Sequence, residues 1–155
     1  MPDKRVAEKL IAENRRARFD YELLDRFEAG IVLTGTEVKS LRQGRATMAQ
    51  SWAEVRENEA WLMGVEIAIY DQGGPMNHEP SRPRKLLMHR REIDRLYGTV
   101  REKGLTLVPT RLYFKDGRVK VELAVARGKE LRDKRRDIAD RDAKRQMDRA
   151  VKQRR

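Results

Sequence analysis

The chain has 155 residues, of which 36 are Lys or Arg and 25 are Asp or Glu, so its formal net charge is +11. Residues 127–155 contain 13 basic and 6 acidic side chains, a net +7, and the other 126 residues contain 23 and 19, a net +4. This asymmetry indicates a polyanionic partner, and nucleic acid is the commonest one. The absence of cysteine excludes disulfides and thiolate metal ligands, and no apolar run reaches the roughly 20 residues of a membrane-spanning helix.

The N-terminal residues are charged, with few apolar side chains. We expect residues 1–12 to form a flexible arm, residues 13–128 a single folded domain and residues 129–155 a basic tail. The first 18 residues lack the apolar stretch of a signal peptide, which favours a cytoplasmic location. From Phe19 onward, "RFDYELLDRFEAGIVLTG" predicts two extended segments that bend around Glu28-Ala29-Gly30.

A short helix and a hairpin are expected next. Thr34 and Glu37 have the spacing of a capping box, and Gly44 is placed to end a helix of about two turns. Residues 51–70 predict a hairpin that turns near Glu57-Asn58-Glu59. Its second arm alternates, and the side chains expected on the buried face are Trp61, Met63, Val65, Ile67 and Ile69.

Residues 71–83 hold three of the five prolines and predict a long loop, a feature that is often functional or disordered. A short strand, "RKLLMH", follows and leads into a helix. One face of this helix carries Ile93, Leu96, Tyr97 and Val100, and Gly104 is its expected C-cap.

Residues 105–128 predict a hairpin that turns at Asp116-Gly117. Pro109 should lie at an edge or a bulge, because it cannot donate to a ladder. The alternating apolar side chains of the second arm are Val119, Val121, Leu123 and Val125. In total, about six antiparallel strands with inserted helices predict a mainly β fold, a small, partly closed barrel resembling the OB-fold.

The tail is rich in helix-forming residues and has acid-to-base pairs at i, i+4, such as Glu130–Lys134 and Asp137–Arg141. Four such pairs contribute about 1–2 kcal/mol together, which is too little to order a helix without a packed apolar stripe. We therefore expect little helix in the free tail and folding inside a polyanionic groove. A solvated charge run that only aids solubility is the alternative, and membrane binding is disfavoured because the tail lacks large apolar side chains.

Catalytic and metal-binding patterns are missing. His78 and His89 are the only histidines, and we expect His78 to be an exposed loop residue and His89 either to contact RNA or to begin the helix. No phosphate-binding loop or nucleophile motif is present, so we expect neither an enzyme nor a bound cofactor or metal. Cations cluster near Phe19 and Tyr21, and basic side chains beside aromatic ones are typical of RNA-binding surfaces.

Several stretches resemble one family closely: "ENRRARFDYELLDRFEAGIVLTGTEVKSLRQG", "NHEPSRPRKLLMHRREIDRLYG", "LTLVPTRLYFKDGRVKVELAVARGK" and "DKR". The chain resembles the SsrA-binding proteins, or small protein B family, of bacterial trans-translation. The resemblance implies a barrel that binds the tRNA-like domain of transfer-messenger RNA (tmRNA) and delivers it, as a monomer on the RNA, to stalled ribosomes. It also implies a tail that enters the empty mRNA channel beyond the decoding centre of the small subunit and folds as a helix there.

The charge pattern and the resemblance together give candidate RNA-binding residues on the barrel: Asn14, Arg15, Tyr21, Glu28, Lys39, Arg42, Arg84, Lys85, Leu87 and His89. Candidate ribosome-binding residues at the tail are Gly128, Lys129, Arg132, Asp133, Lys134, Arg135, Arg136, Arg141, Lys144, Arg145 and Arg149. Glu130 and Arg132 depart from the family pattern, in which a lysine and a ring are common.

Three alternative functions are open at this point. A ribosomal structural protein and another OB-fold translation factor are the first two, because each combines a barrel with basic charge. An RNA-modifying enzyme that uses His78 or His89 is the third.

Overall fold

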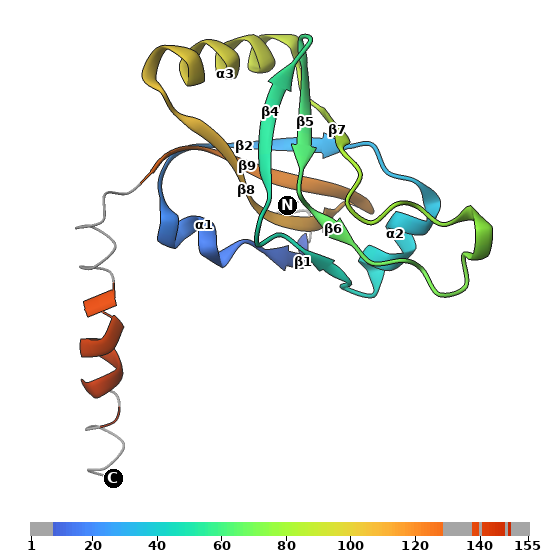
Figure 1. Ribbon diagram of the computed structural model, residues 1–155, viewed down its shortest axis with the longest axis horizontal. Coiled ribbons are helices and arrows are strands. Elements are labelled where there is room, and N and C mark those ends of the chain that lie inside the picture. Colours follow the sequence, from blue (N-terminus) through green and yellow to red (C-terminus); the bar gives the residue numbers. More distant parts are fainter. Residues whose placement is uncertain (1–7, 129–137, 140, 148, 150–155) are drawn as a thin grey trace, which may run out of the picture.

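The computed structural model describes residues 8–128, 138–139, 141–147 and 149 (Figure 1). Nine strands lie among these residues: β1 (Glu8–Glu13), β2 (Tyr21–Ile31), β3 (Ala46–Thr47), β4 (Trp52–Arg56), β5 (Glu59–Met63), β6 (Glu66–Ile67), β7 (Arg84–Leu87), β8 (Thr106–Lys115) and β9 (Arg118–Gly128). The helices of residues 8–128 are α1 (Arg15–Asp20), α2 (Gly35–Arg42), a 3-10 turn η1 (Gly74–Met76) and α3 (Arg90–Lys103).

Six of these strands close into an antiparallel barrel. The order β8-β4-β5-β7-β2-β9 returns to its start because β9 also pairs with β8, and β1 adds a seventh strand on the outer edge of β8. The pairing between neighbouring strands is shortest between β4 and β8, where Ala53 and Leu107 are the paired residues. The interior of the barrel holds fully buried side chains such as Leu62, Leu112 and Val121. The expected OB-like, partly closed β barrel with inserted helices is confirmed.

The two predicted hairpins, β4–β5 and β8–β9, and the two predicted helices, α2 and α3, are confirmed. The β8–β9 turn has Asp116 and Gly117 at φ 53° and 74°, the left-handed region that two-residue hairpin loops require. The β8–β9 register shifts between Pro109 and Arg111, so the proline lies at a bulge, as expected. In α2, Glu37 Oε1 accepts from the Thr34 amide at 2.8 Å, and Gly104 ends α3 at φ 62°.

The chain between residues 8 and 31 differs from the prediction. Residues 8–12, expected in a flexible arm, belong to β1 and pair with β8, and residues 1–7 lie outside the described residues. Asn14 Oδ1 accepts from the Ala17 amide at 3.2 Å, and this cap starts α1, which was not predicted. The predicted bend at Glu28-Ala29-Gly30 is wrong, because these residues lie within β2 and pair with Lys120, Val121 and Glu122 of β9.

The buried face of β5 also differs from the prediction. Ala60 and Leu62 are buried, whereas Trp61 and Met63 are half-buried, because β5 alternates in the opposite phase. Gly64, at φ 74°, then bends the chain, so Val65 and Ile67 are buried as predicted. Ile69, expected on the same face, is exposed.

Part of the tail is helical in this structure. Residues 138–139, 141–147 and 149 are helical and exposed, which differs from the expected lack of helix in the free tail. Residues with high helix preference, such as Ala143, Lys144 and Gln146, favour this conformation. Within the described part of the chain, no helix has the length and apolar character needed to cross a membrane.

Candidate nucleic-acid interface

A hollow of about 420 Å³ lies where β2, β7, β9 and the start of α3 meet; we call it the Glu28 hollow. Its lining residues are Glu28, Gly30, Leu87, Met88, His89, Glu92 and Lys120. The strand registers explain this gathering, because Gly30 of β2 pairs with Leu87 on one side and with Lys120 on the other. Three of the predicted RNA-binding residues, Glu28, Leu87 and His89, therefore line one hollow.

Lys120 is a candidate that sequence reasoning missed. In the sequence of β9 it alternates with the apolar residues Val119 and Val121, and this pattern alone does not distinguish it from other outward-facing cations. Lys120 is identified by the register between β2 and β9, which pairs it with Gly30. Lys120 is the one lysine of a lining that also contains the carboxylates of Glu28 and Glu92, so any phosphate contact inside the hollow falls to its ammonium group.

Gly30 allows β2 and β7 to approach closely at the floor of the hollow. A Cβ at this position would lie 3.2 Å from Leu87 Cβ and 3.6 Å from Leu87 Cδ1. Leu87 is 53% exposed, so it presents an apolar side chain beside Lys120 instead of burying it. An exposed apolar residue at the edge of a charged hollow suits contact with a base or a ribose face.

Glu28 is held as an ionised acceptor. Tyr113 Oη donates to Glu28 Oε2 at 2.6 Å, and Lys115 Nζ lies 3.1 Å from the same oxygen. The Tyr113 hydrogen bond, with help from Lys115 and Lys120 and against the effect of burial, lowers the pKa of the Glu28 carboxyl. Burial and the neighbouring Glu28 raise the pKa of Tyr113, so the hydroxyl keeps its proton. The carboxylate can accept hydrogen bonds from base amino or ribose hydroxyl groups, which orients an RNA without attracting it.

His89 lines the hollow, and Lys85 lies on β7 two residues before Leu87. His89 is the exposed N-cap of α3, where its backbone N–H donates to Glu92 Oε1 at 3.2 Å. Lys85 is half-buried and its Nζ lies 3.7 Å from Glu59 Oε2. His89 thus begins the helix, which is one of the two roles expected for it, and RNA contact by His89 and Lys85 stays a prediction.

Arg84 does not belong to this surface, and its prediction as an RNA contact is wrong. Its side chain is fully buried, and its Nε donates to Glu37 Oε2 at 2.6 Å. Its other nitrogens donate to the carbonyl oxygens of Pro80, Arg82 and Val65. A guanidinium satisfied in this way is a structural tie between α2, the loop and β7.

His78 is also structural, which corrects the expectation of an exposed loop histidine. It is buried, with Nδ1 2.9 Å from Thr36 Oγ1 and Nε2 2.9 Å from the Ile67 carbonyl oxygen. These contacts fix the middle of the proline-rich loop against α2 and β6, while most of its other side chains are exposed.

Asn14, Arg15 and Tyr21 lie far from the Glu28 hollow. Tyr21 and Glu28 are seven residues apart on β2, about 20 Å at the rise of a strand. Asn14 is buried, and its Nδ2 donates to the Pro109 carbonyl oxygen at 2.9 Å, so the predicted RNA contact through this side chain is wrong. Arg15 has a fully exposed position, with 91% of its side chain accessible.

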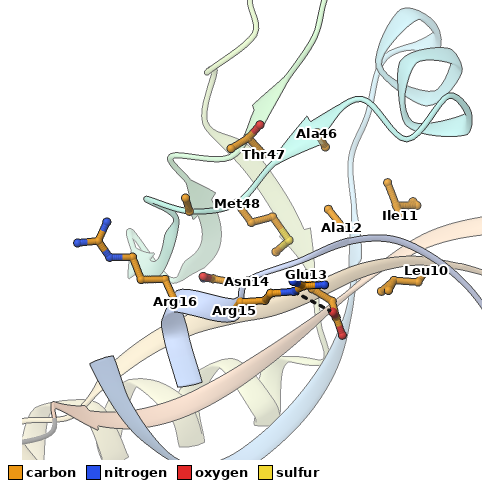
Figure 2. A pocket seen from close by; sticks show the side chains of 11 residues that line it. Leu10, Ile11, Ala12, Glu13, Asn14, Arg15, Arg16, Ala46, Thr47 and Met48 are labelled. Atoms are coloured by element: carbon orange, nitrogen blue, oxygen red, sulfur yellow. Dashed lines mark ion pairs between the residues drawn. The ribbon is translucent and has the colours of Figure 1, made fainter. Parts of the chain in front are cut away.

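Two further hollows adjoin α1. The Met48 groove, of about 560 Å³, is lined by residues 10–16 and 46–49, and Figure 2 shows Arg16 pointing away from it and Arg15 against Glu13. The Trp52 hollow, of about 380 Å³, has a lining that includes Asn14, Arg16, Asp20, Tyr21, Gln50 and Trp52. Asn14 and Arg16 line both, so the two hollows are neighbours on the surface.

Lys39 and Arg42 stand apart from both groups. They lie on α2, on the opposite side of the barrel from α1 (Figure 1). The Lys39 ammonium lies 5.5 Å from the centre of the Tyr70 ring. The candidate RNA-binding residues of the barrel are thus divided among three places.

The tail leaves the barrel beside α1. Gly128, the last residue of β9, pairs with Tyr21. The predicted tail residues Arg141, Lys144, Arg145 and Arg149 are exposed on helical backbone, and the Arg141 guanidinium lies 5.2 Å from the Phe19 ring centre. The predicted residues Lys129, Arg132, Asp133, Lys134, Arg135 and Arg136 lie outside the described residues. Among the described side chains, no three His, Cys, Asp or Glu come together as metal ligands.

Comparisons with known proteins agree with one another. The family model "SmpB protein" matches residues 11–153. The SsrA-binding protein of Thermobifida fusca is 57% identical over 153 residues, which cover 99% of this chain and 96% of that protein. The SsrA-binding protein of Desulforudis audaxviator is 56% identical over 148 residues, which cover 96% and 97%. A solved structure described as "tmRNA-SmpB: a journey to the center of the bacterial ribosome" has a TM-score of 0.65 and 51% identity, and the match covers 77% of this chain and 85% of that one.

Proposed function

The chain belongs to the SmpB protein family, and from this membership we infer that it is a tmRNA-binding factor of bacterial trans-translation. Its partners are tmRNA and the ribosome. We propose that the barrel binds the tRNA-like domain of tmRNA and that the tail acts separately, in the vacant mRNA channel of a stalled ribosome.

The observation that carries the barrel's part is the Glu28 hollow. It combines a held carboxylate acceptor, an exposed apolar side chain and a lysine within one concave surface. We propose that Lys120 and Lys85 contact phosphates, that Glu28 accepts from a base or ribose, and that Leu87 packs against a sugar or base face. Such a combination selects a folded RNA by shape, with charge for affinity and the acceptor for orientation.

The family is an RNA-binding family, and we propose that this member has no catalytic activity of its own. Of the two histidines, His78 is buried with both ring nitrogens engaged and His89 caps a helix. Alanine at His89 should therefore change RNA affinity modestly, and an RNA-modifying enzyme would instead lose turnover.

Variants of the Glu28 hollow test the proposal. Lys120→Ala should weaken binding of the tRNA-like domain and lower the slope of log K against log salt by about 1, because one phosphate contact is lost. Leu87→Ala should weaken binding with an unchanged slope. Lys9→Ala, an exposed lysine of β1 outside the hollow, is the charge-matched control and should bind nearly as well as the parent. Equal losses in Lys9→Ala and Lys120→Ala would contradict a specific role for the hollow.

Salt also separates this function from that of a structural ribosomal protein. A rescue factor should leave the ribosome with its RNA in high salt, whereas a structural subunit should stay bound. Sequencing the RNA that copurifies with the chain identifies the partner directly.

A further inference from the structure

Trp52 is a large aromatic side chain held in place while much of it faces solvent. It is the first residue of β4 and 44% exposed. Gly64, at φ 74°, passes beneath it: a Cβ at position 64 would lie 2.9 Å from Trp52 Cζ3 and 2.4 Å from the Gln50 carbonyl oxygen. The indole therefore lies against a stretch of bare backbone, which fixes the ring without covering it.

The Trp52 hollow provides a second aromatic residue and polar groups around this ring. Tyr21, half-buried at the start of β2, lines the same hollow as Trp52, and Gln50 and Arg16 add an amide and a guanidinium to its edge. Ser51 Oγ, also in the lining, donates to the Met48 carbonyl oxygen at 2.6 Å, so the segment between Gln50 and Trp52 is fixed. A planar ring with an open face beside hydrogen-bonding groups suits an unpaired nucleobase.

The charges of the hollow largely cancel. Arg16 Nε lies 3.2 Å from Asp20 Oδ2, and the two side chains form an i, i+4 pair on α1. Arg15 Nε lies 3.9 Å from Glu13 Oε2 at the adjoining groove. A site whose cations are already paired with acids attracts phosphate weakly, so stacking and hydrogen bonding dominate its affinity for RNA.

We propose that the Trp52 hollow accepts one unpaired nucleobase of a bound RNA, stacked on the indole of Trp52 next to Tyr21. The proposal rests on the proposed function only in requiring that the protein binds RNA. The hollow lies about 20 Å along β2 from the Glu28 hollow and next to the point where the tail leaves, since Gly128 pairs with Tyr21. The base therefore comes either from a distant part of the same RNA or from ribosomal RNA near the tail.

Two substitutions separate stacking from packing. Trp52→Phe keeps an aromatic face, whereas Trp52→Leu keeps apolar bulk against Gly64 and removes the π face. We expect Trp52→Leu to weaken RNA binding about tenfold and Trp52→Phe to weaken it less, with the salt slope unchanged in both. Tyr97→Leu is the matched control: Tyr97 is equally exposed at 44%, but Arg101 covers its ring at 5.3 Å. This control should bind like the parent.

Fluorescence gives a readout that a merely structural role would not move. The chain has two tryptophans, so Trp61→Phe leaves Trp52 as the only indole. Stacking of a base should quench its emission when RNA is added. One arm of the experiment adds the isolated tRNA-like RNA domain and the other adds stalled ribosomes. The RNA that quenches the Trp52 emission is the source of the base.

The outcomes separate this inference from the proposed function. If Lys120→Ala weakens binding while Trp52→Leu binds both RNAs normally and neither quenches Trp52, the hollow is not a base site and the inference is wrong. Failure of Lys120→Ala to weaken binding would count against the Glu28 hollow and leave the quenching result to decide on Trp52. Thermal unfolding of each variant checks that the barrel is intact.

Discussion

Glu37 is a fully buried carboxylate on which three segments converge. Its Oε1 accepts from the Thr34 amide and from Arg82, and its Oε2 accepts from Arg82 and from Arg84. The Arg84 guanidinium is fully buried too, so the positive charge of Arg84 and the negative charge of Glu37 balance each other inside the protein. Removal of one partner leaves the other charged in a low-dielectric interior, which costs far more than the pair itself contributes.

We predict that Glu37→Gln lowers the free energy of unfolding by about 3–5 kcal/mol, because Arg84 then lacks its buried counter-ion. Urea unfolding followed by circular dichroism measures the loss. Glu66→Gln, which alters an exposed glutamate, should change stability by less than about 0.5 kcal/mol. A loss in Glu37→Gln as small as that of the control would show that water reaches the pair.

The hydrogen bond between Tyr113 and Glu28 should make stability depend on pH. The Glu28 carboxyl has a lowered pKa, chiefly because Tyr113 donates to it, so this contribution is present above the ordinary value of 4.5 and is lost as the pH falls through the lower folded value. Tyr113→Phe should be less stable than the parent at pH 7, and the difference should shrink below pH 4.5. Urea unfolding at several pH values measures this, and a difference that stays constant down to pH 3 would contradict it.

At the scale of elements, β2 connects the two hollows, and Gly30 sets its distance from β7. A methyl group at Gly30 would meet Leu87 Cβ at 3.2 Å, which an exposed leucine can relieve by a small shift. We predict that Gly30→Ala changes the unfolding free energy by less than about 1 kcal/mol, since strand preference offsets the crowding, and weakens RNA binding several-fold by displacing Leu87.

Gly98 provides the control for this substitution. It lies within α3, and a Cβ there would have no atom within 4 Å. Gly98→Ala should raise stability by about 0.5–1 kcal/mol through helix preference and leave RNA binding unchanged. Filter binding and urea unfolding on both variants distinguish a local effect at the hollow from a general effect of adding a methyl group.

The elements that sequence reasoning predicted well carry their own boundary signals. Asp116-Gly117 ends β8, the Thr34–Glu37 box starts α2, and Gly104 ends α3. The elements predicted wrongly are those whose conformation depends on a residue far away in the sequence. Residues 28–30 read as a turn, but pairing with β9 keeps them extended, and the cap of α1 depends on Asn14 being held by the Pro109 carbonyl on β8.

The candidate site was predictable in part for the same reason. The resemblance identified Glu28 and Leu87, and the structure brings them together. It could not reveal that Arg84 is buried, because a buried arginine needs its partner Glu37, 47 residues away in sequence. Lys120 and Trp52 were missed because only the registers of β9 and β4 show what lies beside them.

At the scale of the whole molecule, charge is divided between barrel and tail. Residues 129–155 contain 12 basic and 6 acidic side chains, so truncation after Gly128 removes a net +6 of the +11. The described tail residues are exposed, and Arg141 over the Phe19 ring is a surface contact, so truncation should change the unfolding free energy of the barrel by no more than about 1 kcal/mol. We predict that the truncated chain binds the tRNA-like domain within a few-fold of the parent and fails to support tagging on stalled ribosomes.

A full-length chain with a scrambled tail of the same composition decides what the tail contributes. If the tail is only a solvated charge run, the scrambled tail restores tagging, because net charge and salt dependence are preserved. If it must fold in a channel lined with phosphates, scrambling removes the i, i+4 pairs and the placement of arginines such as Arg141 and Arg145, and tagging stays lost while RNA binding by the barrel is intact. Tagging by the scrambled chain at the parent's rate would therefore exclude the sensing role and leave the tail as a source of charge alone.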